Sequence, residues 1–313
     1  MLCWRKWTYS VAKRKQTITN GKWYFKASST DNRQKIVIIK NNKEKYKITN
    51  LCKTLKVARS TFYYQLKSNK LSQAQHIDNT IISIFLKSRK NYGTRKIKVM
   101  LAQQNIILSR IKISQIMQKY NLISNYTKIK YKHHNNKDIT YKYNNLLNQD
   151  FDNYKLHEVV VSDLTYVWIN NQWYYVCLLI DLFNREIISY DVSSHKDAKL
   201  VESTFNKLNF SLENIKIFHT DQESEFNNST IYKLLTKNNV QKSYSKPGYL
   251  YDNAVAESTY KILKTELVKN KKFKSIEEFK LELFDYVNWY NNTRIHSKLN
   301  YLSPIQYKNL YSI

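Results

Sequence analysis

Glycine, proline and cysteine are scarce in this chain of 313 residues, which contains three, two and three of them respectively. Three widely spaced glycines cannot build a G-x-G-x-x-G turn or a Walker A loop, so the sequence disfavours Rossmann dehydrogenases, P-loop ATPases and protein kinases. The cysteines are far apart and include no C-x-x-C pair. They indicate neither a disulfide framework nor a zinc finger, and they fit a reducing, cytosolic setting.

Long apolar runs are missing as well. Charged residues begin at Arg5 with no apolar segment behind them, which argues against a signal peptide. The longest apolar run covers residues 173–180 and stops at Asp181, so it is far too short to span a bilayer. We therefore expect a cytoplasmic protein without a membrane segment.

Acidic residues are rare in the first half of the chain. Overall, 52 Lys and Arg stand against 24 Asp and Glu, a formal net charge of +28. Residues 1–150 hold 32 of the basic residues and 5 of the acidic ones, whereas residues 151–313 hold 20 and 19. A polycationic half with apolar periodicity favours nucleic acid as the partner, because neutralising phosphates releases counterions. A solvated basic surface, or attraction to a membrane, does not explain so uneven a split in a chain without a lipid-anchor signal.

The basic half begins with residues 1–45, which show little helical period and stay unassigned. Residues 46–70 predict a helix-turn-helix, in which Ser60 caps a short second helix that ends at Leu66. Arg59 is then placed to meet phosphate. A generic helical hairpin explains this stretch equally well.

Residues 76–124 predict a compact three-helix DNA-binding module, and residues 125–150 a basic linker. Thr94 and Ser109 are placed to cap the second and third helices of the module. In the second helix Ile97 and Leu101 face inward, and the outward basic residues are candidate DNA contacts: Arg95, Lys96 and Lys98.

From residue 151 to 313 the pattern changes to strands alternating with helices. Strands are expected within 159–168, at 173–180, at 187–192 and at 215–218. Helices are expected at 198–208, 231–235, 254–268 and 276–290, with a loop over 243–252. Three strands in a meander, followed by this alternation, predict an α/β core with helices packed on a mixed sheet.

Three acids in this half lie where packing alone does not favour them. Asp163 interrupts a run suited to a central strand, Asp221 follows a strand, and Glu257 lies early in a helix that Asp252 or Asn253 can cap. Taken singly, they are explained as a strand-edge acid, a turn acid and half of an i,i+4 ion pair. Taken together, they can hold two Mg²⁺ ions for a phosphodiester displacement, because hard oxygen ligands suit that metal.

The segments around these acids resemble those of a known family. The matching segments are residues 162–166, 219–222 and 251–258 around the acids, 90–97 upstream, and 288–296 and 302–304 near the end. They are similar to the second reading-frame product of the IS-three family of insertion-sequence transposases, over residues 46–307. Asp221 and Glu257 are separated by 35 residues, the spacing typical of the family, and Lys264 fills the basic position that follows the glutamate. Glu223 departs from the pattern, since the family usually has glycine there.

The resemblance implies a ribonuclease-H-like, retroviral-integrase-like core with a mixed five-stranded sheet, preceded by all-α helix-turn-helix DNA-binding segments. It implies that the element's ends are cut and that their 3′-hydroxyls are joined to DNA by two-metal transesterification, with Mn²⁺ able to replace Mg²⁺. Asp163, Asp221 and Glu257 would be both catalytic residues and metal ligands. The remaining candidate contacts to DNA phosphates or unpaired bases in this half are Lys261, Lys264, Tyr249 and Tyr251.

The implied partners are double-stranded DNA, namely the terminal inverted repeats and the target, with a homo-oligomer on DNA and the product of the first reading frame. The expected location is the bacterial cytoplasm, with nucleoid association when DNA is bound. Two alternatives stay open: an inactive DNA-binding remnant that acts as a repressor, and a metal-dependent nuclease that cuts without joining.

Overall fold

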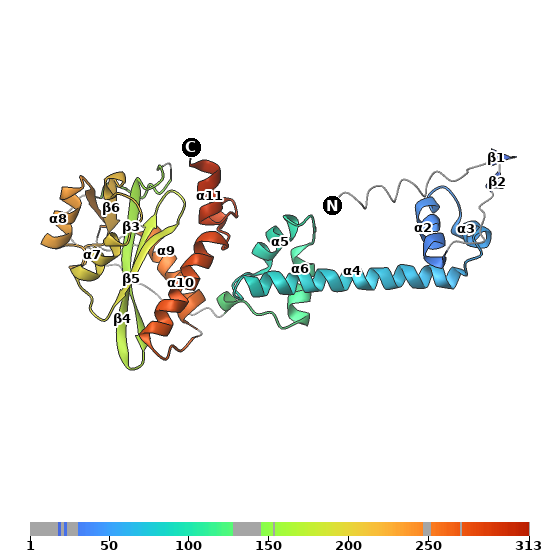
Figure 1. Cartoon of the computed structure of the whole chain (residues 1–313), viewed down its shortest axis with the longest axis horizontal. Coiled ribbons are helices and arrows are strands. Elements are labelled where there is room, and N and C mark those ends of the chain that lie inside the picture. The colour runs from blue at the N-terminus through green and yellow to red at the C-terminus, as the bar shows by residue number, and fades with distance from the viewer. Residues whose placement is uncertain are drawn as a thin grey trace. The chain divides into compact units, whose positions relative to one another are not determined.

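The computed structural model describes residues 18–19, 22–23, 31–127, 145–152, 154–246, 252–269 and 271–312. Tyr249, Tyr251 and most of the predicted basic linker lie outside the described residues. The chain divides into two compact units, Met1–Asn79 and Thr80–Ile313, which we describe separately (Figure 1). No helix among the described residues is long and apolar enough to cross a bilayer.

The first unit contains a short hairpin and a helical cluster. Strands β1 (Ile18–Thr19) and β2 (Lys22–Trp23) pair antiparallel, and helices α2 (Asn32–Asn42) and α3 (Ile48–Thr54) precede the long helix α4 (Arg59–Lys87). Ile39 and Phe62 are fully buried in the core of this cluster. Helix α2 falls within the unassigned residues 1–45 and was not predicted, although Ile36 and Ile39 have helical spacing and are both buried.

The predicted short helix ending at Leu66 is wrong. Helix α4 runs on to Lys87 without interruption. No glycine or proline occurs between positions 59 and 87, so nothing in that stretch breaks the backbone hydrogen bonding. The predicted second helix of the first motif and the first helix of the three-helix module are therefore one element.

In the second unit, the end of α4 is followed by α5 (Thr94–Ala102), α6 (Arg110–Lys119) and the short 3₁₀ helix η2 (Asn125–Thr127). The cap predicted at Ser109 is confirmed, because its side chain accepts a hydrogen bond of 3.2 Å from the backbone N–H of Lys112. The cap predicted at Thr94 is wrong. Thr94 is the first residue of α5 and Gly93 holds the cap position, without a side chain to bond.

The core of the second unit is a mixed five-stranded sheet. Its strands are β3 (Val159–Ile169), β4 (Gln172–Asp181), β5 (Ile187–Ser193), β6 (Ile217–Thr220) and β7 (Gln241–Tyr244), in the order β5-β4-β3-β6-β7. Strand β4 is antiparallel to both neighbours, whereas β6 is parallel to β3 and to β7. Ser243 and Tyr244 lie in β7, so the predicted loop over 243–252 began two residues too early. The strand was missed because its first half, Gln241 and Lys242, is polar.

Helices cover both faces of this sheet (Figure 1). On one side lie α7 (Ala198–Asn206) and α8 (Ser229–Lys237), and η3 (Leu212–Asn214) precedes β6. On the other side lie α9 (Ala254–Leu263), the π-helix η4 (Lys264–Val268) and α10 (Ile276–Asn292). The chain ends with η5 (Ser297–Leu299) and α11 (Pro304–Tyr311).

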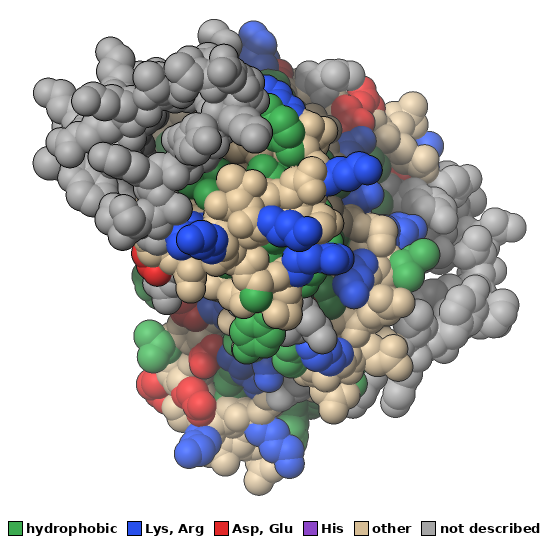
Figure 2. All heavy atoms as spheres, turned by 90° about the vertical axis from the view of Figure 1, so that its right-hand side faces the viewer, with side chains coloured by type: hydrophobic (Ala, Val, Ile, Leu, Met, Phe, Trp, Pro, Cys, Tyr) green, Lys and Arg blue, Asp and Glu red, His purple; other side chains and the backbone are tan. Residues whose placement is uncertain are grey.

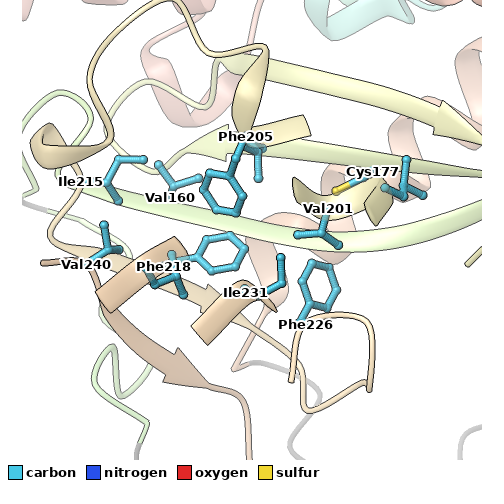
Figure 3. Close-up of a cluster of buried hydrophobic side chains, with 12 residues drawn as sticks. Val160, Cys177, Val201, Phe205, Ile215, Phe218, Phe226, Ile231 and Val240 are labelled. Carbon is cyan, nitrogen blue, oxygen red and sulfur yellow. The ribbon is translucent and has the colours of Figure 1, made fainter. Parts of the chain in front are cut away.

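The core under α7 and α8 is aromatic at its centre. Phe205, Phe218 and Phe226 come from α7, from β6 and from the segment before α8, and they lie against one another in Figure 3. The Phe205 and Phe218 rings meet edge to face with their centroids 4.9 Å apart. Burial of these rings fixes β6 against the helices, and Asp221 follows directly at the end of that strand.

Candidate active site and nucleic-acid interface

Two of the three predicted acids lie on neighbouring parallel strands. Asp163 is within β3, and Asp221 follows the last residue of β6. Val161 of β3 pairs with His219 of β6. Asp163 and Asp221 each follow one of these residues by two positions, so the two acids lie at the same level of the sheet. The carboxyl ends of parallel strands are where sites in α/β proteins gather.

Helix α9 carries the third acid and is fastened to β3 on both sides of it. The Asn253 side chain donates a hydrogen bond of 3.0 Å to the carbonyl of Ser162, and the Tyr260 hydroxyl donates to the carbonyl of Asp163. Glu257 lies one helical turn from each of these anchors. Asn253 is the N-cap residue of α9, as predicted, but its side chain binds the strand and makes no capping bond.

Removing the Tyr260 hydroxyl is expected to loosen this helix. The hydroxyl also accepts a hydrogen bond of 2.6 Å from the backbone N–H of Leu178, so it joins β3, β4 and α9 in a buried position. Tyr260→Phe leaves that N–H without a partner, and we expect it to lower the free energy of unfolding by about 1–3 kcal/mol in urea titrations. Tyr232→Phe is the matched control, because Tyr232 is 65% exposed on α8. Equal stability of the two variants would contradict this role.

The acids disturb one another electrostatically. Burial, together with the negative charges of Glu223 and Glu257, raises the pKa of Asp163 to about 6, against a hydrogen bond from the N–H of Leu164. Burial, then the charges of Glu223 and Asp163, raise the pKa of Asp221 to about 7. Carboxylates that raise one another's pKa lie close enough for a cation among them to be favoured.

Glu223, the departure from the family pattern, belongs to the same group. Its side chain is 41% exposed and forms a salt bridge of 2.7 Å with Lys196, which also lies 3.3 Å from Glu225. Lys196 was not singled out from the sequence, because it stands in the loop before α7 and no motif marks it. The structure shows that this lysine offsets part of the additional negative charge.

The acids have not formed a coordination shell. Over the described ranges, no three His, Cys, Asp or Glu side chains come close enough together to hold a metal ion. Asp163 and Asp221 are partly buried and Glu257 is exposed. Their oxygen donors and mutual repulsion fit a hard divalent cation such as Mg²⁺.

A fourth acid, Asp252, precedes α9 and forms hydrogen bonds that hold the start of this helix in place. It is 1% exposed and accepts hydrogen bonds from the Asn145 side chain (2.7 Å), the Gln149 side chain (2.9 Å) and the backbone N–H of Lys246 (2.9 Å). The sequence marked Asp252 only as a candidate cap. The two side-chain partners are about a hundred residues away along the chain, so no local pattern could reveal this role.

His219, within β6, is a structural residue whose side chain contacts Ser243 of β7 and Ser245. Its ring nitrogens lie 2.8 Å and 3.2 Å from the hydroxyl oxygens of Ser243 and Ser245. Burial lowers the pKa of His219 to about 4, so the imidazole is neutral at pH 7. It therefore adds no positive charge beside Asp221.

Most of the predicted DNA-contacting residues among the described part of the chain are accessible. Arg59, Arg95, Lys98 and Lys261 are exposed. Figure 2 shows that Lys and Arg side chains are more prominent than Asp and Glu on the visible surface of the described residues. Lys264 is partly buried, with its Nζ 4.3 Å from the centroid of the Tyr166 ring. Its charge also acts on Asp163, so Lys264 lies beside the acids.

The expectation that Lys96 faces outward is wrong. Lys96 is partly buried, with its Nζ 5.0 Å from the centroid of the Tyr92 ring. Burial, and then the positive charge of Arg294, lower the pKa of Lys96 to about 7. The proximity of Arg294, which is 198 positions further along the chain, shows that Lys96 lies away from the exposed face of α5.

Charge removal on the exposed face of α5 is expected to weaken DNA binding. Removal of one phosphate-binding charge should reduce the slope of log K against log salt concentration by about 0.9. We expect this reduction for Arg95→Ala and for Lys98→Ala, measured by fluorescence anisotropy with a labelled duplex between about 50 and 200 mM salt. An exposed lysine far along the chain, Lys237→Ala on α8, serves as the control. An unchanged slope for either variant on α5 would remove that residue from the interface.

The class of the protein follows from the sheet and from family matches. The integrase core domain family matches residues 153–249 and 257–310, and the HTH-like domain family matches residues 72–130. Together with the mixed five-stranded sheet and its flanking helices, these matches define a polynucleotidyl transferase that cuts and joins DNA, with an integrase-like α/β core. They confirm the predicted fold class.

Three relatives define the family. The transposase for insertion sequence element IS904 of Lactococcus lactis subsp. lactis (strain IL1403) is 33% identical over 239 residues, covering 74% of this chain and 94% of that protein. The putative transposase InsK for insertion sequence element IS150 of Escherichia coli (strain K12) is 29% identical over 269 residues, covering 84% and 94%. The transposase InsF for insertion sequence IS3A of the same strain is 26% identical over 287 residues, covering 88% and 98%. The chain belongs to the IS3 (IS-three) family of insertion-sequence transposases, as the sequence resemblance predicted.

Proposed function

We propose that this transposase cuts the ends of its own insertion sequence and joins the resulting 3′-hydroxyls to target DNA by direct transesterification. Asp163, Asp221 and Glu257 would hold two Mg²⁺ ions, with Mn²⁺ as a substitute. The observation that carries the proposal is the fastening of α9 to β3 through Asn253 and Tyr260, with Glu257 between these two anchors and its charge acting on Asp163.

The proposed reaction forms no covalent bond between the protein and the DNA. The 3′-oxygen attacks phosphorus, one phosphodiester bond forms as another breaks, and the leaving oxygen takes the proton that the attacking hydroxyl gives up. Bound divalent cations would activate the attacking oxygen and stabilise the leaving one. No Ser or Tyr nucleophile is needed, and no nucleotide triphosphate is consumed, which agrees with a sequence that cannot build a P-loop.

The other residues of the site bind and orient the DNA. Lys264, which packs on the Tyr166 ring and whose charge acts on Asp163, would contact a phosphate near the scissile bond. Lys261 is exposed one turn after Glu257 and would contact a neighbouring phosphate. Tyr249 and Tyr251 remain proposed stacking residues for unpaired bases.

The proposed partners are the terminal inverted repeats, target DNA and the product of the first reading frame. Joining two ends requires them to be held together, so we expect a homo-oligomer on DNA in the cytoplasm at the nucleoid. Light scattering of the complex with end DNA measures its mass. A complex of one protein with one DNA end, under conditions where joining occurs, would contradict the oligomer.

The test of the reaction uses purified full-length protein, labelled DNA that carries the element's ends, and an unlabelled target. We expect cleaved and joined products with Mg²⁺ or Mn²⁺, and neither with EDTA. Cleavage without joining would instead identify a nuclease. DNA binding without any chemistry would identify an inactive remnant that acts as a repressor, and Glu223→Gly would then test whether the additional carboxylate causes the loss.

A further inference from the structure

A cavity of about 550 Å³ lies beside α9, away from the candidate active site. The helix lines it with residues at helical spacing: Ala254, Val255, Ser258, Thr259 and Ile262. At 100° per residue these positions cover one side of the helix; Glu257 lies outside that arc, and Lys261 lies at its edge, next to Ala254. The volume is within the range of sites that hold small ligands or parts of larger ones.

The charged side chains around the cavity leave an excess of positive charge. The cationic side chains that line it are Lys96, Arg185, Arg294 and Lys298. The anionic ones are Asp150 and Asp152. Arg294 is neutralised by the buried Glu266 at 2.9 Å. Arg185 and Lys298 share a single carboxylate, that of Asp152, at 3.5 Å and 2.8 Å.

Arg185 also brings a donor that nothing in the described chain satisfies. The side chain is nine-tenths buried, and its Nη2 donates to the carbonyl of Phe151 at 2.9 Å. Its Nη1 is buried and has no hydrogen-bond partner among the described residues. An unsatisfied guanidinium donor is costly, which is a reason to expect an acceptor in this place.

Lys96 reaches the same cavity from α5. Among the described residues it forms no salt bridge, and the charged neighbour with the largest effect on it is the cation Arg294. His296, which also lines the cavity, is neutral because burial lowers its pKa. Glu266 is the carboxylate whose charge acts on Lys96, and it is already paired with Arg294. The lining therefore offers the Arg185 guanidinium and the Lys96 amino group to an incoming anion.

We propose that this cavity is a phosphate-binding subsite that takes a phosphate of the DNA backbone, with Lys96 and Arg185 as its donors. DNA is the favoured source because the cavity lies between α5, which exposes Arg95 and Lys98, and α9, which exposes Lys261. The assignment to DNA rests on the proposed function, whereas the affinity for phosphate does not.

The first arm of the test measures inorganic phosphate binding to the full chain by isothermal calorimetry in a buffer free of other oxyanions. We expect wild type and Lys96→Arg to bind, and Lys96→Met to bind at least about tenfold more weakly, because it lacks the charge-assisted hydrogen bond. Lys237→Met is the control, because Lys237 is exposed on α8 and outside the proposed interface, and it should bind phosphate as wild type does. Circular dichroism melts establish that each variant is folded.

The second arm measures the salt dependence of DNA binding. Lys96→Met should reduce the slope by about 0.9, the value for one phosphate contact, and inorganic phosphate should not restore it. No phosphate binding by the wild type, or equal binding by Lys96→Met, would overturn the subsite. Loss of phosphate binding with an unchanged DNA slope would overturn DNA as the source and assign the subsite to a free phosphate compound. Neither arm depends on strand joining, so failure of the proposed reaction is a separate result.

Discussion

Glu266→Gln is expected to lower the free energy of unfolding by about 3–5 kcal/mol, because it leaves a buried arginine without its counter-charge. Glu266 lies in the π-helix η4, and Arg294 follows α10. Both are more than nine-tenths buried, and the carboxylate accepts hydrogen bonds from Arg294 Nε and Nη2 at 2.9–3.1 Å. Burial alone lowers the pKa of Arg294, but Glu266 beside it raises that pKa above the usual value.

Two tyrosines complete this network. The Tyr126 and Tyr286 hydroxyls donate to the two oxygens of Glu266 at 2.5 Å and 3.0 Å. Tyr126 belongs to η2 of the HTH-like module, and Tyr286 to α10 of the integrase core. The carboxylate therefore joins these two parts of the second unit, and its loss should loosen both.

The matched control for Glu266→Gln is Glu282→Gln. Glu282 forms a salt bridge with Lys271 at the surface, with both side chains at least about a third exposed, so its loss should cost less than about 1 kcal/mol. Guanidinium titrations followed by circular dichroism measure both variants. The double variant Glu266→Gln/Arg294→Met removes the unpaired charge and should recover part of the loss. If Glu266→Gln is no less stable than Glu282→Gln, the network does not hold the two parts together.

Asp221→Asn and Glu257→Gln are expected to reduce strand joining by about 10²–10⁴-fold, since each removes a negative charge that the proposed divalent cations need. DNA affinity should stay equal to that of wild type or rise slightly, because a negative charge near the DNA is removed. Asp163→Asn should behave alike. Joining is measured as labelled product against time at saturating Mg²⁺.

The control for the carboxamide series is Glu213→Gln, an exposed acid in η3. It should join DNA at the wild-type rate. A metal titration separates the explanations further, because wild type should gain thermal stability with Mn²⁺ while Asp221→Asn gains little. Wild-type joining by any one of the three carboxamide variants would exclude that acid from the catalytic set.

Local patterns were sufficient to predict the acids and the elements that carry them. The apolar runs around Asp163 and before Asp221 are dense enough to predict strands, and the helix after Asp252 has clear 3.6-residue periodicity. The resemblance of the segments around the acids predicted the family, and the alternation of strands and helices predicted the α/β core. Such patterns can be found without knowing which segments meet.

Contacts between segments that are distant in the sequence determine which of the other charged residues are buried and which are paired. The helical position of Lys96 predicted that it faces outward. In the structure Lys96 is partly buried, contacts the Tyr92 ring and lies near the positive charge of Arg294. Glu266 follows α9 as an ordinary acid in the sequence, and its partners include residues 28 and 140 positions away. Asp252 and the unsatisfied donor of Arg185 depend in the same way on segments that are distant along the chain. Burial and pairing of a charge are set by which distant side chains surround it, and the local periodicity of a sequence contains no record of those neighbours.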